Sequence, residues 1–194
     1  MRRIIVSNLI TQDGFFAGPN GELDWHMIDE EFDAYAADQL STMDAILFGR
    51  VTYEMMASYW PTSDAMFDDP LVAEYMNSLP KIVFSTTLDH AGWGNWNNVS
   101  LVRDQVAERV AELKHQPGRD MVIFGSGALV SSLALHGLID EYRLITHPIV
   151  LGNGRPMFRN LTCPIELKLL GVRVFRSGKV LSCYKQVQHE MEPA

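Results

Sequence analysis

The segment with the clearest chemical potential is Gly125-Ser126-Gly127. It stands between an apolar run, Met121 to Phe124, and a stretch with helically spaced apolar residues, Ala128 to His136. This strand–turn–helix order predicts that the backbone can approach a ligand closely, with the first N–H groups of the helix facing it. Such N–H groups favour an anion, typically a phosphate. The alternative is ordinary structure, because glycine between a strand and a helix is common in α/β proteins.

The G-x-G-x-x-G fingerprint of Rossmann domains is not completed here. Its third glycine would fall at Val130, and about twenty residues further on the chain offers His147 in place of an acidic residue. Any dinucleotide must therefore be bound by a different α/β scheme.

Hydrophobic periodicity predicts the elements that position this segment. Short apolar runs predict strands at Arg3 to Ile10, Ala45 to Phe48, Lys81 to Phe84, Val99 to Val102, Met121 to Phe124 and Tyr142 to Thr146. Helical spacing predicts helices at residues 29–40, 52–58, 71–79, 105–115 and 128–136. Strands alternating with helices indicate an α/β fold with a largely parallel sheet. A hairpin at Leu167 to Phe175 and Val180 to Val187 makes the expected sheet mixed, with an antiparallel C-terminal edge. Residues 189–194 are expected to fray.

Composition is that of an ordinary globular protein. The 194 residues are 47% hydrophobic and 21% charged, which is compatible with a single domain over residues 1–194. The net charge of −8 argues against a general nucleic-acid partner or an anionic membrane. No segment approaches the ~20 apolar residues of a membrane helix, so a cytoplasmic location is the default expectation. Cys163 and Cys183 lie in no metal-binding pattern, and we expect neither a metal site nor a disulfide.

Three predicted strand ends carry a recognisable set of motifs. They are Gly49-Arg50-Val51-Thr52-Tyr53-Glu54, Ser85-Thr86-Thr87 and Gly125-Ser126-Gly127, in this order. The set resembles the dihydrofolate-reductase-like superfamily, which implies a three-layer α/β fold that binds NADPH. The resemblance places the cofactor against Gly49, Arg50, Thr52, Ser85, Thr86, Gly125, Ser126 and Gly127.

Further segments look like the reductase domain of riboflavin biosynthesis and its stand-alone bacterial relatives. They are Asp13-Gly14-Phe15, Ala17-Gly18, Leu23-Asp24-Trp25, Leu138-Ile139-Asp140-Glu141 and Pro148 to Gly154. This resemblance implies an NADPH-dependent reductase of a pyrimidine or pterin-like heterocycle, with 5-amino-6-(5-phosphoribosylamino)uracil as the family's best-known substrate. It also implies a homodimer, which we expect to form through the strand Tyr142 to Pro148 and the loop containing Gly152 and Gly154.

The residue types suit these cofactor roles, although each has a structural alternative. Arg50 offers a permanently charged fork for a phosphate, and Thr52 a hydroxyl donor at the adjacent helix start. The alternative for Arg50 is a surface arginine without a particular role. Ser85 and Thr86 can bond a ribose or its 2′-phosphate, but such residues also cap helices and turns.

On the substrate side, Asp33 is the candidate catalytic residue, because its place before Gly49 resembles that of the single carboxylate of folate reductases. A partly buried aspartate could orient an aminopyrimidine or pterin ring through two hydrogen bonds. Its helix is acidic throughout, however, so a solvated face is the alternative. Asp13, Asp24 and Trp25 are expected to line the substrate pocket, with a core anchor as the alternative for Trp25. A phosphorylated ribose would need further cations, for which Arg143, Arg155 and Arg159 are available.

Two other functions stay open. One is folate reduction, in which Asp33 would be essential. The other is a nucleotide-binding module without catalysis, suggested by the acidic segment Asp64 to Glu74, which would cover the pocket.

Overall fold

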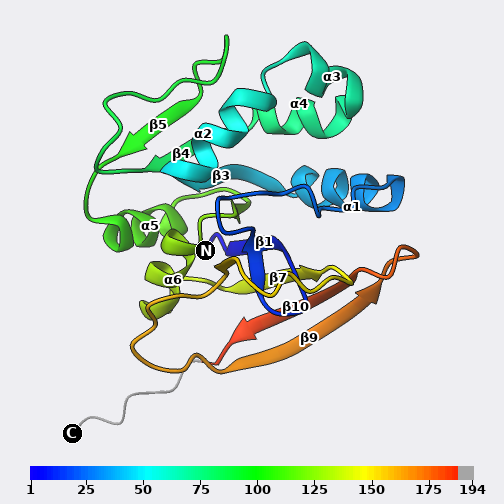
Figure 1. Cartoon of the computed structure of the whole chain (residues 1–194). Coiled ribbons are helices and arrows are strands. Elements are labelled where there is room, and N and C mark those ends of the chain that lie inside the picture. The colour runs from blue at the N-terminus through cyan, green and yellow to red at the C-terminus, as the bar shows by residue number, and fades with distance from the viewer. Residues whose placement is uncertain (188–194) are drawn as a thin grey trace, which may run out of the picture.

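An eight-stranded β-sheet organises the computed structural model, which describes residues 1–187 (Figure 1). The predicted fraying of residues 189–194 lies outside the described residues. The strands are β1 (Ile4–Ile10), β3 (Met43–Gly49), β4 (Lys81–Phe84), β5 (Val99–Val102), β6 (Asp120–Phe124), β7 (Glu141–Thr146), β9 (Leu167–Val174) and β10 (Val180–Gln186). Their order is β5-β4-β3-β6-β1-β7-β10-β9. The first six are parallel, while β10 runs antiparallel to both its neighbours, which confirms the predicted mixed sheet.

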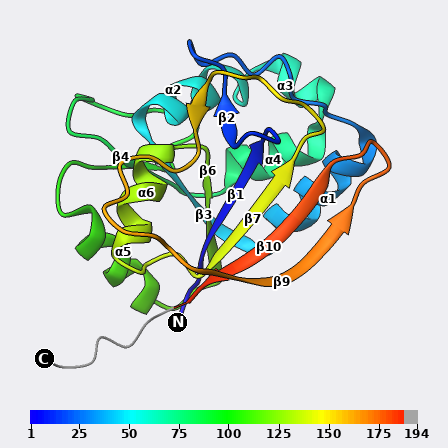
Figure 2. The same ribbon diagram turned by 60° about the horizontal axis from the view of Figure 1, so that its bottom comes forward.

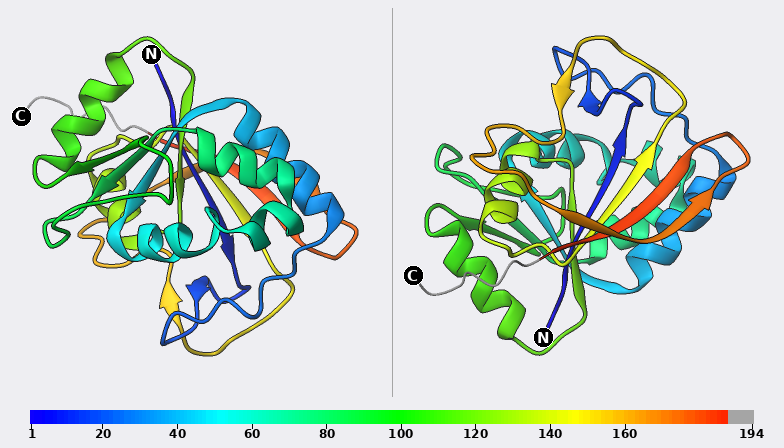
Figure 3. Two further views of the ribbon diagram at one scale, coloured as in Figure 1. Left: turned by 90° about the horizontal axis from the view of Figure 1, so that it is seen from above. Right: turned by 90° about the horizontal axis from the view of Figure 1, so that it is seen from below.

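Helices cover both faces of the sheet, which makes three layers. They are α1 (Glu30–Ser41), α2 (Arg50–Tyr59), α3 (Ser63–Asp68), α4 (Pro70–Ser78), α5 (Val106–His115) and α6 (Gly127–Leu135). Alternation along the strands explains the layers: Ile4 and Val6 of β1 pack in the core under α5 and α6, whereas Ile5 packs in the core under α1, α2 and α4. The two views of Figure 3 show these two faces. None of the helices within residues 1–187 has the length and apolar character that crossing a membrane requires.

Register brings the motif-bearing strand ends to one edge of the sheet. Gly49 at the end of β3 pairs with Phe84 at the end of β4, and Ser7 of β1 pairs with Phe124 at the end of β6. In open α/β sheets, ligands bind outside the carboxyl ends of the strands. The fold therefore assembles the three predicted cofactor motifs at the edge where a ligand is expected.

A second, two-stranded sheet lies beyond this edge. It pairs β2 (Phe15–Ala17) with β8 (Arg155–Pro156), and Figure 2 shows β2 beyond the carboxyl end of β1. The sequence analysis did not predict either strand, nor the short helix α3. Elements of two to six residues are too short to carry a periodic signal.

An ion pair between a partly exposed aspartate and a buried lysine fixes the start of α1. The Asp29 side chain accepts a hydrogen bond from the N–H of Phe32 and lies 2.7 Å from the Nζ of Lys179, whose side chain is fully buried. The Lys179 hydrogen bond, followed by that from Phe32, lowers the pKa of Asp29 to about 2. Because this folded-state pKa lies below the ordinary value, the stabilisation is present above about pH 4 and is lost as the pH falls towards 2.

We therefore expect Asp29→Ala to lower the free energy of unfolding at pH 7 by about 1–2 kcal/mol, since it removes a helix cap and leaves Lys179 with only the carbonyl of Met27 as partner. Urea unfolding at pH 7 and pH 2.5 would measure this. An equal difference from the wild type at both pH values would contradict the assignment.

The sheet topology excludes one way of forming the predicted dimer. β7 lies between β1 and β10 and is hydrogen-bonded on both sides, so the edge of the strand Tyr142 to Pro148 is not available to a second copy. The sheet ends instead at β5 and β9, and β9 exposes Leu169, Leu170, Val172 and Val174. The homodimer itself stays a prediction, which equilibrium sedimentation at micromolar concentration would test.

Candidate active site at the carboxyl ends of the strands

Side-chain hydrogen bonds tie three strand ends together. The side chain of Asn8 on β1 accepts from the N–H of Gly125 at 2.5 Å, and the Thr52 hydroxyl accepts from the N–H of Ser126 at 2.9 Å. The Ser126 hydroxyl in turn accepts from the N–H of Gly49 at 2.7 Å. The N–H of Ser126 is thus used inside the protein, whereas the first N–H groups of α6, beginning at Gly127, have no acceptor within their helix.

Two of these glycines are required by their surroundings. Gly125 has a φ of +59°, and a Cβ there would lie 2.7 Å from the Thr52 hydroxyl oxygen. A Cβ at Gly49 would lie 3.0 Å from the Ser126 hydroxyl oxygen. The two strand ends are therefore packed closely against the side chains of Thr52 and Ser126, and glycine at both positions lets them approach.

The first of two cavities at this edge, the smaller cavity, has a volume of about 490 Å³. Seven of the eight predicted cofactor residues line it: Gly49, Arg50, Thr52, Ser85, Thr86, Ser126 and Gly127. Arg50 is the first residue of α2 and pairs with Glu54 at 2.9 Å. Both side chains are nearly half exposed, so this pair is weak and leaves Arg50 free to turn towards an anion.

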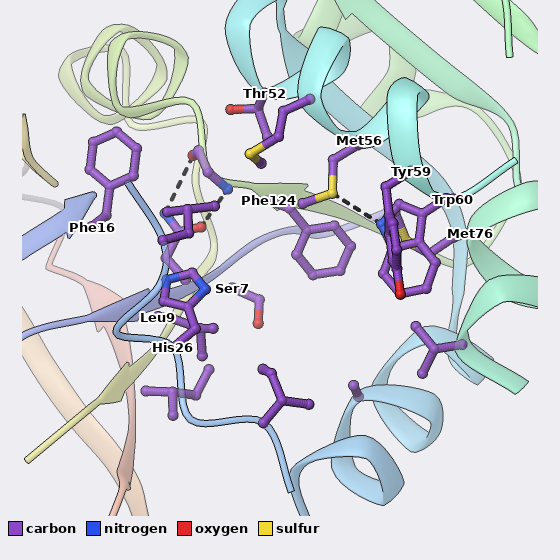
Figure 4. A pocket seen from close by; sticks show the side chains of 18 of the residues that line it. Ser7, Leu9, Phe16, His26, Thr52, Met56, Tyr59, Trp60, Met76 and Phe124 are labelled. Carbon is purple, nitrogen blue, oxygen red and sulfur yellow. Dashed lines mark hydrogen bonds between the residues drawn. The ribbon is translucent and has the colours of Figure 1, made fainter. Parts of the chain in front are cut away.

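The larger cavity has a volume of about 780 Å³ and lies between the sheet and α1, α2 and α4. Gly125, the eighth predicted cofactor residue, lines this one. Figure 4 shows Met56, Tyr59, Trp60 and Met76 gathered on one side of it, with the Trp60 indole N–H donating to the sulfur of Met56. Because Phe16, Val51, Thr52 and Arg155 line both cavities, the two are neighbouring parts of one site.

Asp33 lines the larger cavity. Burial raises the pKa of its carboxyl group, and the charges of Asp69 and Asp29 raise it further. This carboxyl group therefore keeps its proton to a higher pH than an ordinary aspartate. A cleft carboxyl group with a raised pKa is suited to holding a polar ring and to proton transfer.

The other three expected substrate-pocket residues, Asp13, Asp24 and Trp25, are absent from the lining of both cavities. Asp13 is exposed and accepts from the N–H of Gly152 at 2.7 Å, which fixes the turn before β2. Asp24 points to solvent. Trp25 is buried, in agreement with the core-anchor alternative.

Trp25 nevertheless supports a residue that does reach the site. Its ring packs edge-on against His26 at 4.3 Å and against His147 at 5.2 Å, and His26 lines the larger cavity (Figure 4). Burial lowers the pKa of His26 to about 4, with a contribution from His147. His26 is therefore a neutral imidazole at pH 7.

The three arginines considered for an anionic substrate lie in different places. Arg143 is mostly buried and bonded to Glu141 at 2.6 Å, away from both cavities. Arg159 lines the smaller cavity alone, and Arg155 lines both. Arg155 is therefore the one Lys or Arg side chain, among residues 1–187, that lines the larger cavity.

Comparison with known proteins identifies the family. The model of the RibD C-terminal domain matches residues 2–181. The chain belongs to this family. It is 36% identical over 183 residues to the uncharacterized protein YyaP of Bacillus subtilis, covering 94% of each chain.

Solved structures agree on the fold. A putative riboflavin biosynthesis protein from Shewanella sp. PV-4 matches with a TM-score of 0.73 and 23% identity, covering 96% of this chain and 99% of that one. Dihydrofolate reductase from Enterococcus faecalis, solved with NADP(H), matches with a TM-score of 0.63 and 16% identity, covering 96% and 97%. The dihydrofolate-reductase-like fold predicted for this RibD-family domain is confirmed.

The sequence analysis missed several residues of the site. Arg103 lines the smaller cavity just after the end of β5, next to Ser85 and Thr86, and the rule of strand ends would have found it. Phe16 and His26 come from loop and short-strand segments whose place depends on tertiary contacts. No sequence pattern indicated these two.

Proposed function

We propose that this chain is a cytoplasmic NADPH-dependent reductase of a pyrimidine or pterin-like heterocycle. The observation that carries the proposal is the continuity of two cavities at one sheet edge. The smaller is lined by the phosphate-binding residue types, and the larger contains an aspartate with a raised pKa. Membership of the RibD C-terminal domain family supports it.

The residues of the smaller cavity fit NADPH. Gly49 lies at the cavity wall, Gly127 begins a helix whose N–H groups attract phosphate, and Arg50 and Arg159 add positive charge. When bound, NADPH supplies a hydride. Thr52, Phe16 and Val51 line both cavities and would hold the two ligands in contact.

Asp33 would orient the substrate. Its carboxyl group would bond the amino and ring nitrogens of the heterocycle, and its raised pKa lets it hold a proton at the atom that must receive one. The apolar wall formed by Phe124, Leu40 and Val72 would keep water away from the ring.

Thermal unfolding in the presence of ligands tests the cofactor part of the proposal. A ligand at ~100 times its dissociation constant adds about 2.7 kcal/mol to the native state. We expect saturating NADPH to raise the melting temperature by several degrees, and FMN to leave it unchanged. Stabilisation by FMN alone would refute the proposal.

Arg103 should select NADPH over NADH. Its guanidinium bonds the carbonyl of Asp89 at 2.6 Å, pairs with no carboxylate within residues 1–187, and lies with Ser85 and Thr86 in the smaller cavity. We expect Arg103→Ala to weaken NADPH binding about tenfold and NADH binding hardly at all, since a charge-assisted bond to the 2′-phosphate is worth roughly 1.5–3 kcal/mol.

Fluorescence titration with both nucleotides would measure this. Arg109→Ala is the matched control, because Arg109 is an exposed arginine on α5 outside both cavities. Equal weakening for NADPH and NADH would contradict the assignment.

Folate reduction remains the alternative reaction, and the presence of Asp33 in the cavity favours it. Turnover of dihydrofolate would distinguish it from reduction of an aminouracil. Hydride transfer to either substrate would count against a module that binds nucleotides without catalysis.

A further inference from the structure

The wall of the larger cavity carries information about the substrate beyond its ring. Asp33 lies on α1, and the chain continues this wall with Tyr59 and Trp60 at the end of α2 and with Val72 and Met76 on α4. In Figure 4 the labelled members of this set lie on the side of the cavity away from Phe16. A substrate ring held by Asp33 would therefore direct any substituent that points away from the cofactor onto aromatic and thioether side chains.

The charges on the same wall are negative. Asp68 at the end of α3 and Asp69, between α3 and α4, line the cavity together with Asp33, and the Asp69 charge is close enough to raise the pKa of Asp33. Asp68 accepts a hydrogen bond from the Tyr59 hydroxyl at 3.0 Å, so its carboxylate is held at the rim. A phosphate or carboxylate on the substituent would meet these carboxylates without a cation to balance them.

Among the described residues, Arg155 is the one lysine or arginine that lines this cavity, and it lies in a part of the cavity away from this wall. Arg155 is on β8, pairs in register with Ala17 of β2, and also lines the smaller cavity. Its position at the junction suits an anion of the cofactor. It does not belong to the α1, α2 and α4 wall.

From this wall we infer that the substrate carries an uncharged, apolar or aromatic arm in place of a phosphoribosyl or glutamyl group. The inference rests on the proposed function, since it takes the ring to be held by Asp33 beside the cofactor. It changes the expected substrate class from phosphorylated aminouracils and folates to neutral heterocycles with an apolar substituent.

Three probes with one ring and different arms test this inference. They are 2,4-diaminopyrimidines carrying at position 5 a methyl group, a benzyl group, or a benzyl group with a phosphonate on its ring. Dissociation constants are measured by calorimetry on the full chain saturated with NADPH. We expect the benzyl compound to bind at least tenfold more tightly than the other two. Equal or tighter binding of the phosphonate, or failure of all three to bind, would overturn the inference.

A charge reversal at the rim sharpens the test. Asp68→Lys should improve binding of the phosphonate relative to the benzyl compound at least tenfold, since a new cation would face the phosphonate. Glu74→Lys makes the same change of charge on an exposed face of α4 outside the cavity and should alter neither constant. Equal gains in both variants would show a general effect of net charge and would overturn the inference.

The proposed function is judged separately. NADPH oxidation by an aminouracil or a dihydropterin, measured on the same protein, decides whether the chain is a reductase. A reductase that prefers the phosphonate probe would keep its proposed function and lose only this inference.

Discussion

Asp33→Asn is expected to lower kcat/KM for NADPH-dependent reduction by 100-fold or more. Asparagine keeps the shape of the side chain but cannot deliver a proton, and general acid–base catalysis is worth roughly 10²–10⁴-fold. NADPH affinity should be unchanged, because Asp33 lines the larger cavity and not the smaller one. Steady-state kinetics with the substrate found by screening, together with NADPH titration, would measure both.

The same variant should be more stable than the wild type at pH 7. The folded-state pKa of Asp33 is raised, so the ionised carboxylate destabilises the folded protein and neutral asparagine relieves this. The difference in melting temperature should shrink as the pH falls through the raised pKa and close only below the ordinary aspartate pKa of about 3.9, where Asp33 is neutral in both the folded and the unfolded state. Asp38→Asn, on the exposed face of the same helix, is the control. Near-wild-type turnover in Asp33→Asn would reject the catalytic role.

Gly125→Ala is expected to weaken NADPH binding by about 10–100-fold. The added Cβ would lie 2.7 Å from the Thr52 hydroxyl oxygen, and the displaced Thr52 could no longer accept from the N–H of Ser126. Overpacking of this kind costs about 1–3 kcal/mol of folding free energy. Calorimetric titration with NADPH would measure this loss of affinity.

Gly137→Ala separates this contact from the backbone penalty. Gly137 has a φ of +63°, close to the +59° of Gly125, yet nothing lies within 4 Å of its Cβ position. In both variants, alanine in the left-handed backbone conformation destabilises the protein by about 1–2 kcal/mol. An NADPH affinity lowered equally in both would show that strain alone, and not the strand-end packing, accounts for the effect.

Sequence periodicity predicted the central strands well because β1, β3, β4 and β6 are mostly buried apolar runs. The β4 and β5 bounds agree with the prediction, and the antiparallel hairpin of β9 and β10 followed from its turn at Ser177-Gly178. Motifs at strand ends were also predictable, since parallel strands that end in ligand-binding residue types bring them to one edge.

The substrate side was less predictable because tertiary contacts decide which helix and loop residues face the larger cavity. Asp33 sits on a helix with many acidic residues, and sequence alone could not distinguish the one that faces a cavity. Trp25 was expected beside the substrate, whereas the structure buries it behind His26, which takes that place. The strand Tyr142 to Pro148 was expected at a dimer interface. The sequence did not show that β7 is paired on both sides, because strand order is a long-range property.

Deuterium transfer tests the central claim most directly. The full chain is incubated with a panel of aminouracils and dihydropterins and with NADPH that carries deuterium at C4 of the nicotinamide, on one face or on the other. The masses of the products are measured by mass spectrometry. We expect the product to contain one deuterium atom when one of the two labelled cofactors is used, and we expect this transfer to be lost in Asp33→Asn. NADPH that binds tightly but passes deuterium to none of these heterocycles would contradict it.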